Sequence, residues 1–192
     1  MKRKIFSLLL CAILCVSAVW LTACTGTSTD TSTDGNPTVG TKIGNLCPSY
    51  ELEVFDESGL NGTKADPSKS GKVTVINFWG TWCSSCVAEL PYFDDAAKSY
   101  GDDVVVYAVH TDDDFNTAPA YVEANYKNSS MVFLKDAAGN NGADVYWKKL
   151  GGAYNVYPFT VILDKEGVIS YTNLGAVPEE TLLSEIDKAL GK

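Results

Sequence analysis

Three short apolar runs, rich in valine, isoleucine and aromatic residues, strongly restrict what this chain can fold into. They are Val73–Trp79, Val104–His110 and residues 159–164. Runs of this length and composition are typical of buried β-strands, because β-branched and aromatic side chains pack well on a pleated surface. Segments with a helical period lie between them. This alternation predicts an α/β domain with a central mixed sheet that helices cover on both faces.

The segments around these runs predict further elements. In residues 86–100 the apolar side chains recur on one helical face, and Pro91 should kink that helix. Residues 116–126 and 144–150 predict two shorter helices. A last helix opens at Pro178 and ends at Gly191.

Two segments before the first run and one after the third complete the expected architecture. Residues 50–55 alternate like a strand, whereas residues 61–72 are polar and predict a loop. A turn at 165–167 joins the third run to residues 168–171, which predicts a β-hairpin.

Composition sets limits on the class of protein. The chain has 192 residues, of which 45% are hydrophobic and 20% charged, as expected for one globular domain. Its 15 basic and 24 acidic side chains give a formal net charge of −9. A nucleic-acid-binding surface needs a basic footprint, so we expect no nucleic-acid partner.

The first residues have the pattern of a secretory signal. A basic start at residues 2–4 precedes an apolar run over residues 5–21, and small residues then lead to Cys24. An uncut signal anchor is the alternative, although the run is slightly shorter than the ~20 residues of a spanning helix. An ending at cysteine resembles the lipobox of bacterial lipoproteins, in which that cysteine is acylated. We therefore expect a signal peptide at 1–23, a lipidated Cys24 with a polar tether to residue 40, and a domain at 41–192.

Cys83 and Cys86 form a C-x-x-C pair where the first apolar run meets the predicted helix. A helix N-terminus carries unpaired N–H groups and partial positive charge, which would stabilise a thiolate on Cys83. Cys86 would then lie close enough to resolve a mixed disulfide. The spacing alone also fits half a zinc site or a structural bridge. Zinc would need two more ligands, and the body offers only Cys47 and His110.

The residues around the pair make the motif more specific. Residues 78–91 read FWGTWCSSCVAELP, which closely resembles the active-site segment of the thioredoxin superfamily. More narrowly, it is similar to the ResA/TlpA-like branch, whose members are membrane-attached thiol–disulfide oxidoreductases of the bacterial cell surface. Residues 44–50 and 157–164 match further anchors, so the resemblance covers about residues 40–190.

The resemblance implies a thioredoxin-like fold with an N-terminal strand extension and a helical insertion before the cis-proline strand. It implies no metal and no organic cofactor, only a redox-active Cys83–Cys86 disulfide. The implied catalytic residues are Cys83, Cys86 and Glu89, and the implied substrate-binding residues are Trp82, Tyr157 and a cis Pro158.

Proton handling depends on residues near the pair. Family members with glutamate at the position of Glu89 are thought to use it in proton transfer, whereas a solvated surface acid is the alternative. Asn77 stands where thioredoxin has a buried aspartate, and an amide cannot titrate. The Ser84-Ser85 dipeptide differs from those of better-known members and leaves the direction of electron flow open.

The resemblance also implies a setting. We expect a monomer, lipid-anchored on the extracytoplasmic face of the bacterial membrane, that reduces exported proteins such as apocytochrome c or surface redox enzymes. Its electrons would come from an integral-membrane thiol carrier of the CcdA/DsbD type. The alternative is a Sco-like copper metallochaperone, although that family uses C-x-x-x-C plus a distal histidine. We expect His110 to be structural, and Cys47 to be buried and inert or else a resolving partner.

Overall fold

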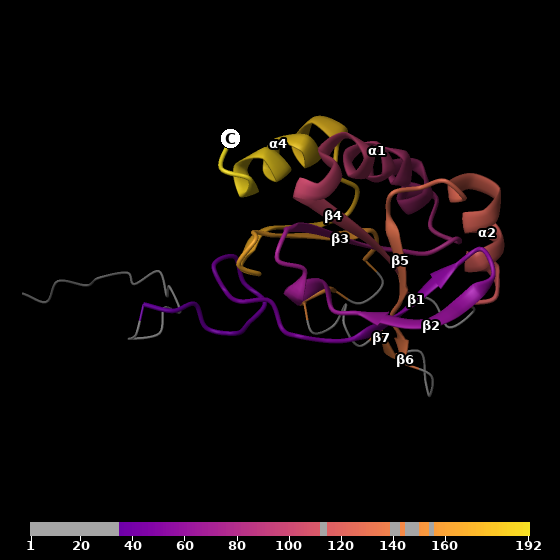
Figure 1. Cartoon of the computed structure of the whole chain (residues 1–192), viewed down its shortest axis with the longest axis horizontal. Helices are drawn as coiled ribbons and strands as arrows, with labels where there is room; N and C mark the ends of the chain where they lie inside the picture. Colours follow the sequence, from indigo (N-terminus) through magenta and orange to yellow (C-terminus); the bar gives the residue numbers. More distant parts are fainter. Residues whose placement is uncertain (1–34, 112–114, 139–142, 145–149, 154–155) are drawn as a thin grey trace, which may run out of the picture.

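The computed structural model describes residues 35–111, 115–138, 143–144, 150–153 and 156–192 (Figure 1). The expected signal peptide, Cys24 and most of the tether lie outside the described residues. So does nearly all of the helix expected at 144–150, and with it the helical insertion before the cis-proline strand. Asp144, at its start, instead belongs to the short strand β7.

A seven-stranded mixed sheet forms the centre of the described part of the chain. Neighbours β3 and β4 are parallel, as are β4 and β5, whereas every other pairing is antiparallel. In spatial order the strands are β2 (Gly59–Ala65), β1 (Leu52–Asp56), β5 (Val132–Lys135), β4 (Val104–His110), β3 (Val73–Trp79), β8 (Phe159–Leu163) and β9 (Ile169–Leu174). A separate small ribbon pairs β6 (Ala137–Ala138) with β7 (Ala143–Asp144).

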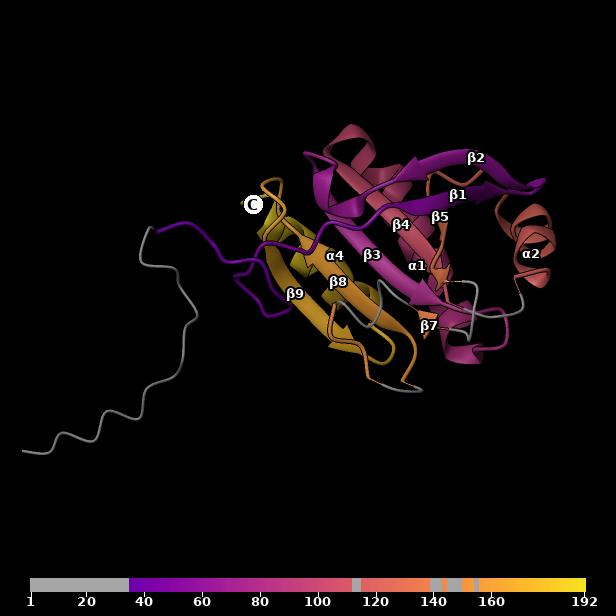
Figure 2. The same ribbon diagram turned by 90° about the horizontal axis from the view of Figure 1, so that it is seen from below.

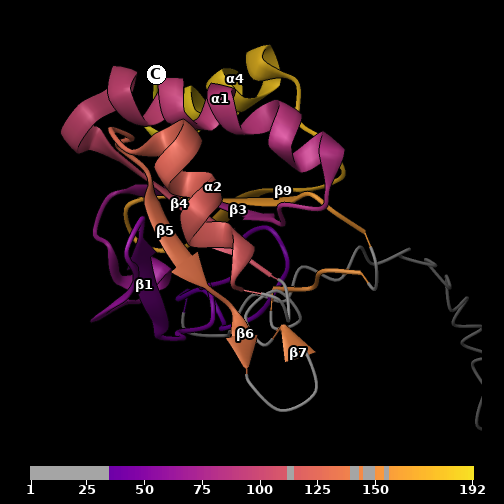
Figure 3. The same cartoon turned by 90° about the vertical axis from the view of Figure 1, so that its right-hand side faces the viewer.

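In the described part of the chain the helices pack on one face of this sheet, and the expected helical cover of the other face stays a prediction. Figures 1 and 3 show α1 (Ser84–Tyr100) and α4 (Glu179–Ala189) side by side on one face. The shorter α2 (Thr117–Tyr126) contributes Ala118 and Val122 to the hydrophobic core that lies under α1 and α4. Short 3-10 turns, η1 (Pro67–Lys69) and η2 (Gly101–Asp103), precede β3 and β4.

The two faces of β3 pack into two different cores, because successive side chains of a strand point in opposite directions. Val75 and Trp79 join the core under α1, whereas Ile76 and Phe78 join the core on the opposite face. Figure 2 looks at that opposite face and shows the N-terminal segment crossing the sheet. All seven residues of β3 are buried, so the strand is a rigid support for the turn that follows it.

The expected strands and helices are largely confirmed, and besides the β6–β7 ribbon, which was not expected, there are two differences. The polar loop expected at 61–72 is wrong over residues 61–65, because β2 occupies Gly59–Ala65. Its side chains are mostly exposed, so no apolar alternation marks the strand, and backbone pairing with β1 holds it in place. No strand was expected at Val132–Lys135, where the four residues of β5 pair with β4 and β1.

Candidate active site

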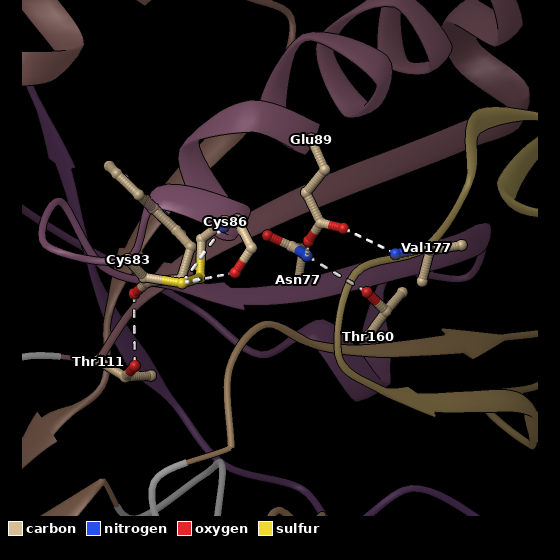
Figure 4. The surroundings of a disulfide bond; sticks show 9 residues. Asn77, Cys83, Cys86, Glu89, Thr111, Thr160 and Val177 are labelled. Carbon is tan, nitrogen blue, oxygen red and sulfur yellow. Dashed lines mark hydrogen bonds between the residues drawn. A yellow bond between two sulfur atoms is a disulfide. The ribbon is translucent and has the colours of Figure 1, made fainter.

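The cysteine pair lies where β3 ends and α1 begins. Cys83 is the N-cap of α1, with extended backbone angles, and forms a disulfide with Cys86 (Figure 4). The Cα atoms of the two cysteines are 5.2 Å apart. The expected strand–turn–helix placement of the pair is therefore confirmed.

One backbone N–H and one side-chain hydroxyl at the helix start lie next to the sulfur of Cys83. The N–H of Cys86 donates to Cys83 Sγ at 3.2 Å, and the Ser85 hydroxyl lies 3.4 Å from the same atom. Donors in this position stabilise negative charge, so they favour a thiolate on Cys83 after reduction. Cys83 retains 6% exposure and Cys86 none, so a reaction partner reaches Cys83 first.

Two aromatic side chains lie together beside the pair. Trp82 is 57% exposed, and its indole packs edge-on against the ring of Tyr157 with 5.4 Å between centroids. The Tyr157–Pro158 peptide bond is cis, as the resemblance implied. The structure thus brings together the turn before α1 and the segment before β8, which are far apart in sequence.

Gly80 makes room for this arrangement. A Cβ atom on Gly80 would lie 2.6 Å from Nε1 of Trp82, closer than van der Waals contact allows. Any larger residue at position 80 would therefore displace the exposed indole from its place against Tyr157.

Glu89 is buried, and the alternative of a solvated surface acid is wrong. Only 2% of the residue is exposed. Its Oε1 accepts a hydrogen bond from Nδ2 of Asn77, and its Oε2 accepts one from the N–H of Val177, both at 2.8 Å (Figure 4). Burial raises the pKa of Glu89 to about 7, although the hydrogen bonds from Val177 and Asn77 act to lower it. A carboxyl group with such a pKa can both accept and donate a proton near neutral pH.

Two partners in this site were missed by sequence reasoning. Val177 precedes α4, 88 residues after Glu89, and Thr160 lies on β8 within 3.2 Å of Asn77 Nδ2. No local pattern connects residues so far apart in the chain. Only the neighbouring positions of β3 and β8 in the sheet bring Asn77 and Thr160 together.

The two remaining candidates of the sequence analysis lie inside the protein. His110 is fully buried among aromatic rings, including Trp79 at 5.2 Å between centroids, as expected of a structural residue. Cys47 is buried, and its thiol lies 3.6 Å from the carbonyl oxygen of Pro48. Among the described residues there is no group of three or more histidine, cysteine, aspartate or glutamate side chains that could hold a metal ion. In that same part of the chain, no helix has the length and apolar character needed to cross a membrane.

Known proteins share this architecture. The Redoxin family model matches residues 40–190. The thiol:disulfide interchange protein DsbE of Pseudomonas aeruginosa is 30% identical over 138 residues, which are 72% of this chain and 69% of that protein. The thioredoxin-like protein YneN of Bacillus subtilis is 31% identical over 154 residues, 78% of this chain and 81% of that one. The structure of the pneumococcal exposed lipoprotein thioredoxin Etrx1 of Streptococcus pneumoniae matches with a TM-score of 0.59 at 25% identity, covering 73% of this chain and 99% of that one.

The matched region contains the seven-stranded sheet, the paired cysteines at the start of α1 and the cis proline. The chain therefore belongs to the Redoxin family, and it is a thioredoxin-like thiol–disulfide oxidoreductase of the DsbE/ResA type.

Proposed function

We propose that this protein is a lipid-anchored reductase on the extracytoplasmic face of the bacterial membrane, and that it reduces disulfides in exported proteins. The observation that carries this proposal is the unequal placement of the two sulfurs. Cys83, at a helix N-terminus, is slightly exposed to solvent, whereas Cys86 is fully buried. Such a pair separates the sulfur that attacks from the sulfur that resolves.

The reaction balances within the pair and its substrate. The Cys83 thiolate attacks one substrate sulfur, the substrate S–S bond breaks, and the other substrate sulfur leaves as a thiolate that takes up a proton. Cys86 then loses its proton and attacks Cys83 Sγ. The Cys83–Cys86 disulfide forms, and the substrate sulfur that was bonded to Cys83 leaves and takes up a proton. Two electrons have then passed to the substrate. Glu89, with a pKa of about 7, is the group we assign to move the proton.

Substrate contact falls on the surface beside Cys83. The exposed Trp82 and its neighbour Tyr157 form an apolar platform next to the disulfide. The backbone before Pro158 would pair with an extended substrate segment as an added strand. Apocytochrome c and oxidised surface enzymes are the substrates we propose, with an integral-membrane thiol carrier of the CcdA/DsbD type as electron donor.

The location rests on the sequence at the start of the chain. The basic, apolar and small-residue pattern that ends at Cys24 supports export and acylation. The polar residues after Cys24 would then serve as a tether. The name of the pneumococcal relative describes that protein as an exposed lipoprotein, which agrees with this proposal.

Trapping tests the substrate class. Full-length Cys86→Ser should accumulate mixed disulfides between Cys83 and exported proteins in cells, because the resolving sulfur is absent. Cys83→Ser and the double variant are the matched controls and should trap none of these proteins. If Cys86→Ser holds no exported protein, the proposed role is wrong.

The redox state of the pair in cells tests the direction. If a thiol donor keeps the reductase in its reduced form, Cys83 and Cys86 should be mostly thiols in cells. Acid quenching followed by labelling with a mass-tagged maleimide would reveal this. A pair found mostly as the disulfide in growing cells would contradict the reductase direction.

A further inference from the structure

Asn77 is a polar residue inside an apolar layer. On β3 it lies between Val75 and Trp79, which pack with Cys86 and Leu90 in the core under α1. Alternation along the strand puts Asn77 on this same face. The residue is fully buried, so every polar atom of its amide needs a partner inside the protein.

The nitrogen of the Asn77 amide has hydrogen-bond partners, whereas its oxygen has none in the described part of the chain. Nδ2 donates to Oε1 of Glu89 at 2.8 Å and to Oγ1 of Thr160 at 3.2 Å. Oδ1 is buried and accepts no hydrogen bond from the residues that the structure describes. In Figure 4 the amide lies between the disulfide and the Glu89 carboxyl group, with its oxygen turned to the disulfide side.

The Glu89 carboxylate fixes this orientation. A carboxylate oxygen only accepts hydrogen bonds, so rotating the amide would set Oδ1 of Asn77 against Oε1 of Glu89. The acceptor is therefore held on the side of the sulfurs, where the oxidised pair has no hydrogen to offer. Reduction changes this, since two electrons and two protons convert the disulfide into two thiols, and the buried thiol of Cys86 becomes a donor.

We propose that Oδ1 of Asn77 accepts a hydrogen bond from the Cys86 thiol in the reduced protein, which makes Asn77 a positioning residue for the resolving sulfur. The bond holds Cys86 as a thiol while Cys83 reacts. It is lost when Cys86 gives up its proton and attacks Cys83 Sγ. This inference rests on the resolving role assigned to Cys86 under the proposed function.

Of the free enzyme's two redox states, only the dithiol has this bond, so the bond should stabilise the dithiol relative to the disulfide. Asn77→Leu removes the acceptor at similar volume, and also removes the unpartnered oxygen from the disulfide state. Both effects shift the equilibrium with glutathione toward the disulfide, by about two- to tenfold given the usual net strength of one hydrogen bond.

Infrared spectroscopy of the S–H stretch tests the bond directly. Full-length protein in detergent, reduced with a phosphine that has no S–H group, is compared with Cys86→Ala, so that the difference spectrum isolates Cys86. We expect the Cys86 band at lower wavenumber than that of a thiol without a hydrogen bond. The band should move up in Asn77→Leu and stay low in Asn77→Asp, which keeps an acceptor oxygen.

Thr160→Val is the matched control. It removes the other partner of Nδ2 from the same buried layer but leaves Oδ1 in place, so the Cys86 band should not move. A wild-type band at the position of a thiol without a hydrogen bond overturns the inference even if Asn77→Leu fails to fold. Neither the band nor the glutathione equilibrium needs a protein substrate, so failure here is distinct from failure of the trapping experiment.

Discussion

Glu89 shows how opposing effects on one residue are decided by burial. Taking a carboxyl group out of water favours its neutral form, whereas two hydrogen-bond donors favour its charged form. Here burial is the larger effect, and it raises the pKa from the ordinary 4.5 to about 7. Glu89 therefore changes charge in the pH range where thiol–disulfide exchange takes place in most cells.

Glu89 should make stability depend on pH in a defined direction. Its pKa is higher in the folded protein than in the unfolded chain, so the folded protein binds more protons between about pH 4.5 and 7. The contribution is most favourable below this window, and the free energy of unfolding should fall as pH rises through it. Relative to Glu89→Gln, the oxidised wild type should lose on the order of 3 kcal/mol. Urea denaturation from pH 4 to pH 8 measures this difference.

The exposed Glu51 provides the control for that experiment. Glu51→Gln should follow the wild-type curve in parallel at every pH, because the substitution changes no buried charge. If the curves of Glu89→Gln and the wild type are also parallel, the carboxyl group does not titrate in this window.

Among single residues, the two reactive cysteines could be predicted from the sequence, but the partners of the residues around them could not. The pairing of Cys83 with Cys86 depends on local spacing at a helix start, which can be recognised in a short stretch of letters. The Glu89 carboxylate accepts a hydrogen bond from the N–H of Val177, and the Asn77 amide donates one to Thr160, across 88 and 83 residues of chain. Only the folded arrangement of β3, β8 and α4 defines those contacts.

Among the elements, α1 contains a proline, a residue that disfavours the interior of a helix. The helix runs from Ser84 to Tyr100 with Pro91 inside it. Proline has no N–H, so the carbonyl of Val87, four residues earlier, lacks its usual donor. Pro91 is exposed, and its ring contributes little to the core.

Replacing this proline should stabilise the helix. Pro91→Ala restores the missing N–H at an exposed site, so the free energy of unfolding should rise by about 1–3 kcal/mol. Urea denaturation of the oxidised protein measures the change. Ser99→Ala, at another exposed position of the same helix, should change it by only about 0.5 kcal/mol. A lower stability for Pro91→Ala would mean that the proline ring contributes to the packing of α1.

The strands differ in how well they can be predicted from the sequence. β3, β4 and β8 are buried apolar runs, so their composition alone identifies them. β2 is mostly exposed and β5 has four residues, so neither shows a period. Backbone pairing with their neighbours creates these two strands, and that pairing is a property of the sheet rather than of the segment.

For the whole molecule, the anchor is the part of the proposal that depends on residues outside the described fold. Cys24→Ser should abolish incorporation of a fatty-acid label and, once the signal peptide is removed, release the protein from washed membranes, because the acidic domain is repelled by anionic lipid. Cell fractionation and labelling measure both effects.

Cys47→Ser is the matched control for the anchor, since it removes a buried cysteine from the domain. This variant should remain labelled and membrane-bound. Equal retention of Cys24→Ser and wild type, without any label on either, would instead favour the uncut signal anchor.

The short connection between β9 and α4 closes the site from the far end of the chain. The N–H of Gly175 donates to the carbonyl of Pro158 at 2.7 Å, and the N–H of Val177 holds Glu89. Ribosomes deliver a chain from its N-terminus, so both reactive cysteines emerge well before these two donors. During synthesis the thiols are thus present before the Val177 N–H that holds Glu89, and the proposed proton carrier takes its place only once the β9–α4 connection has been made.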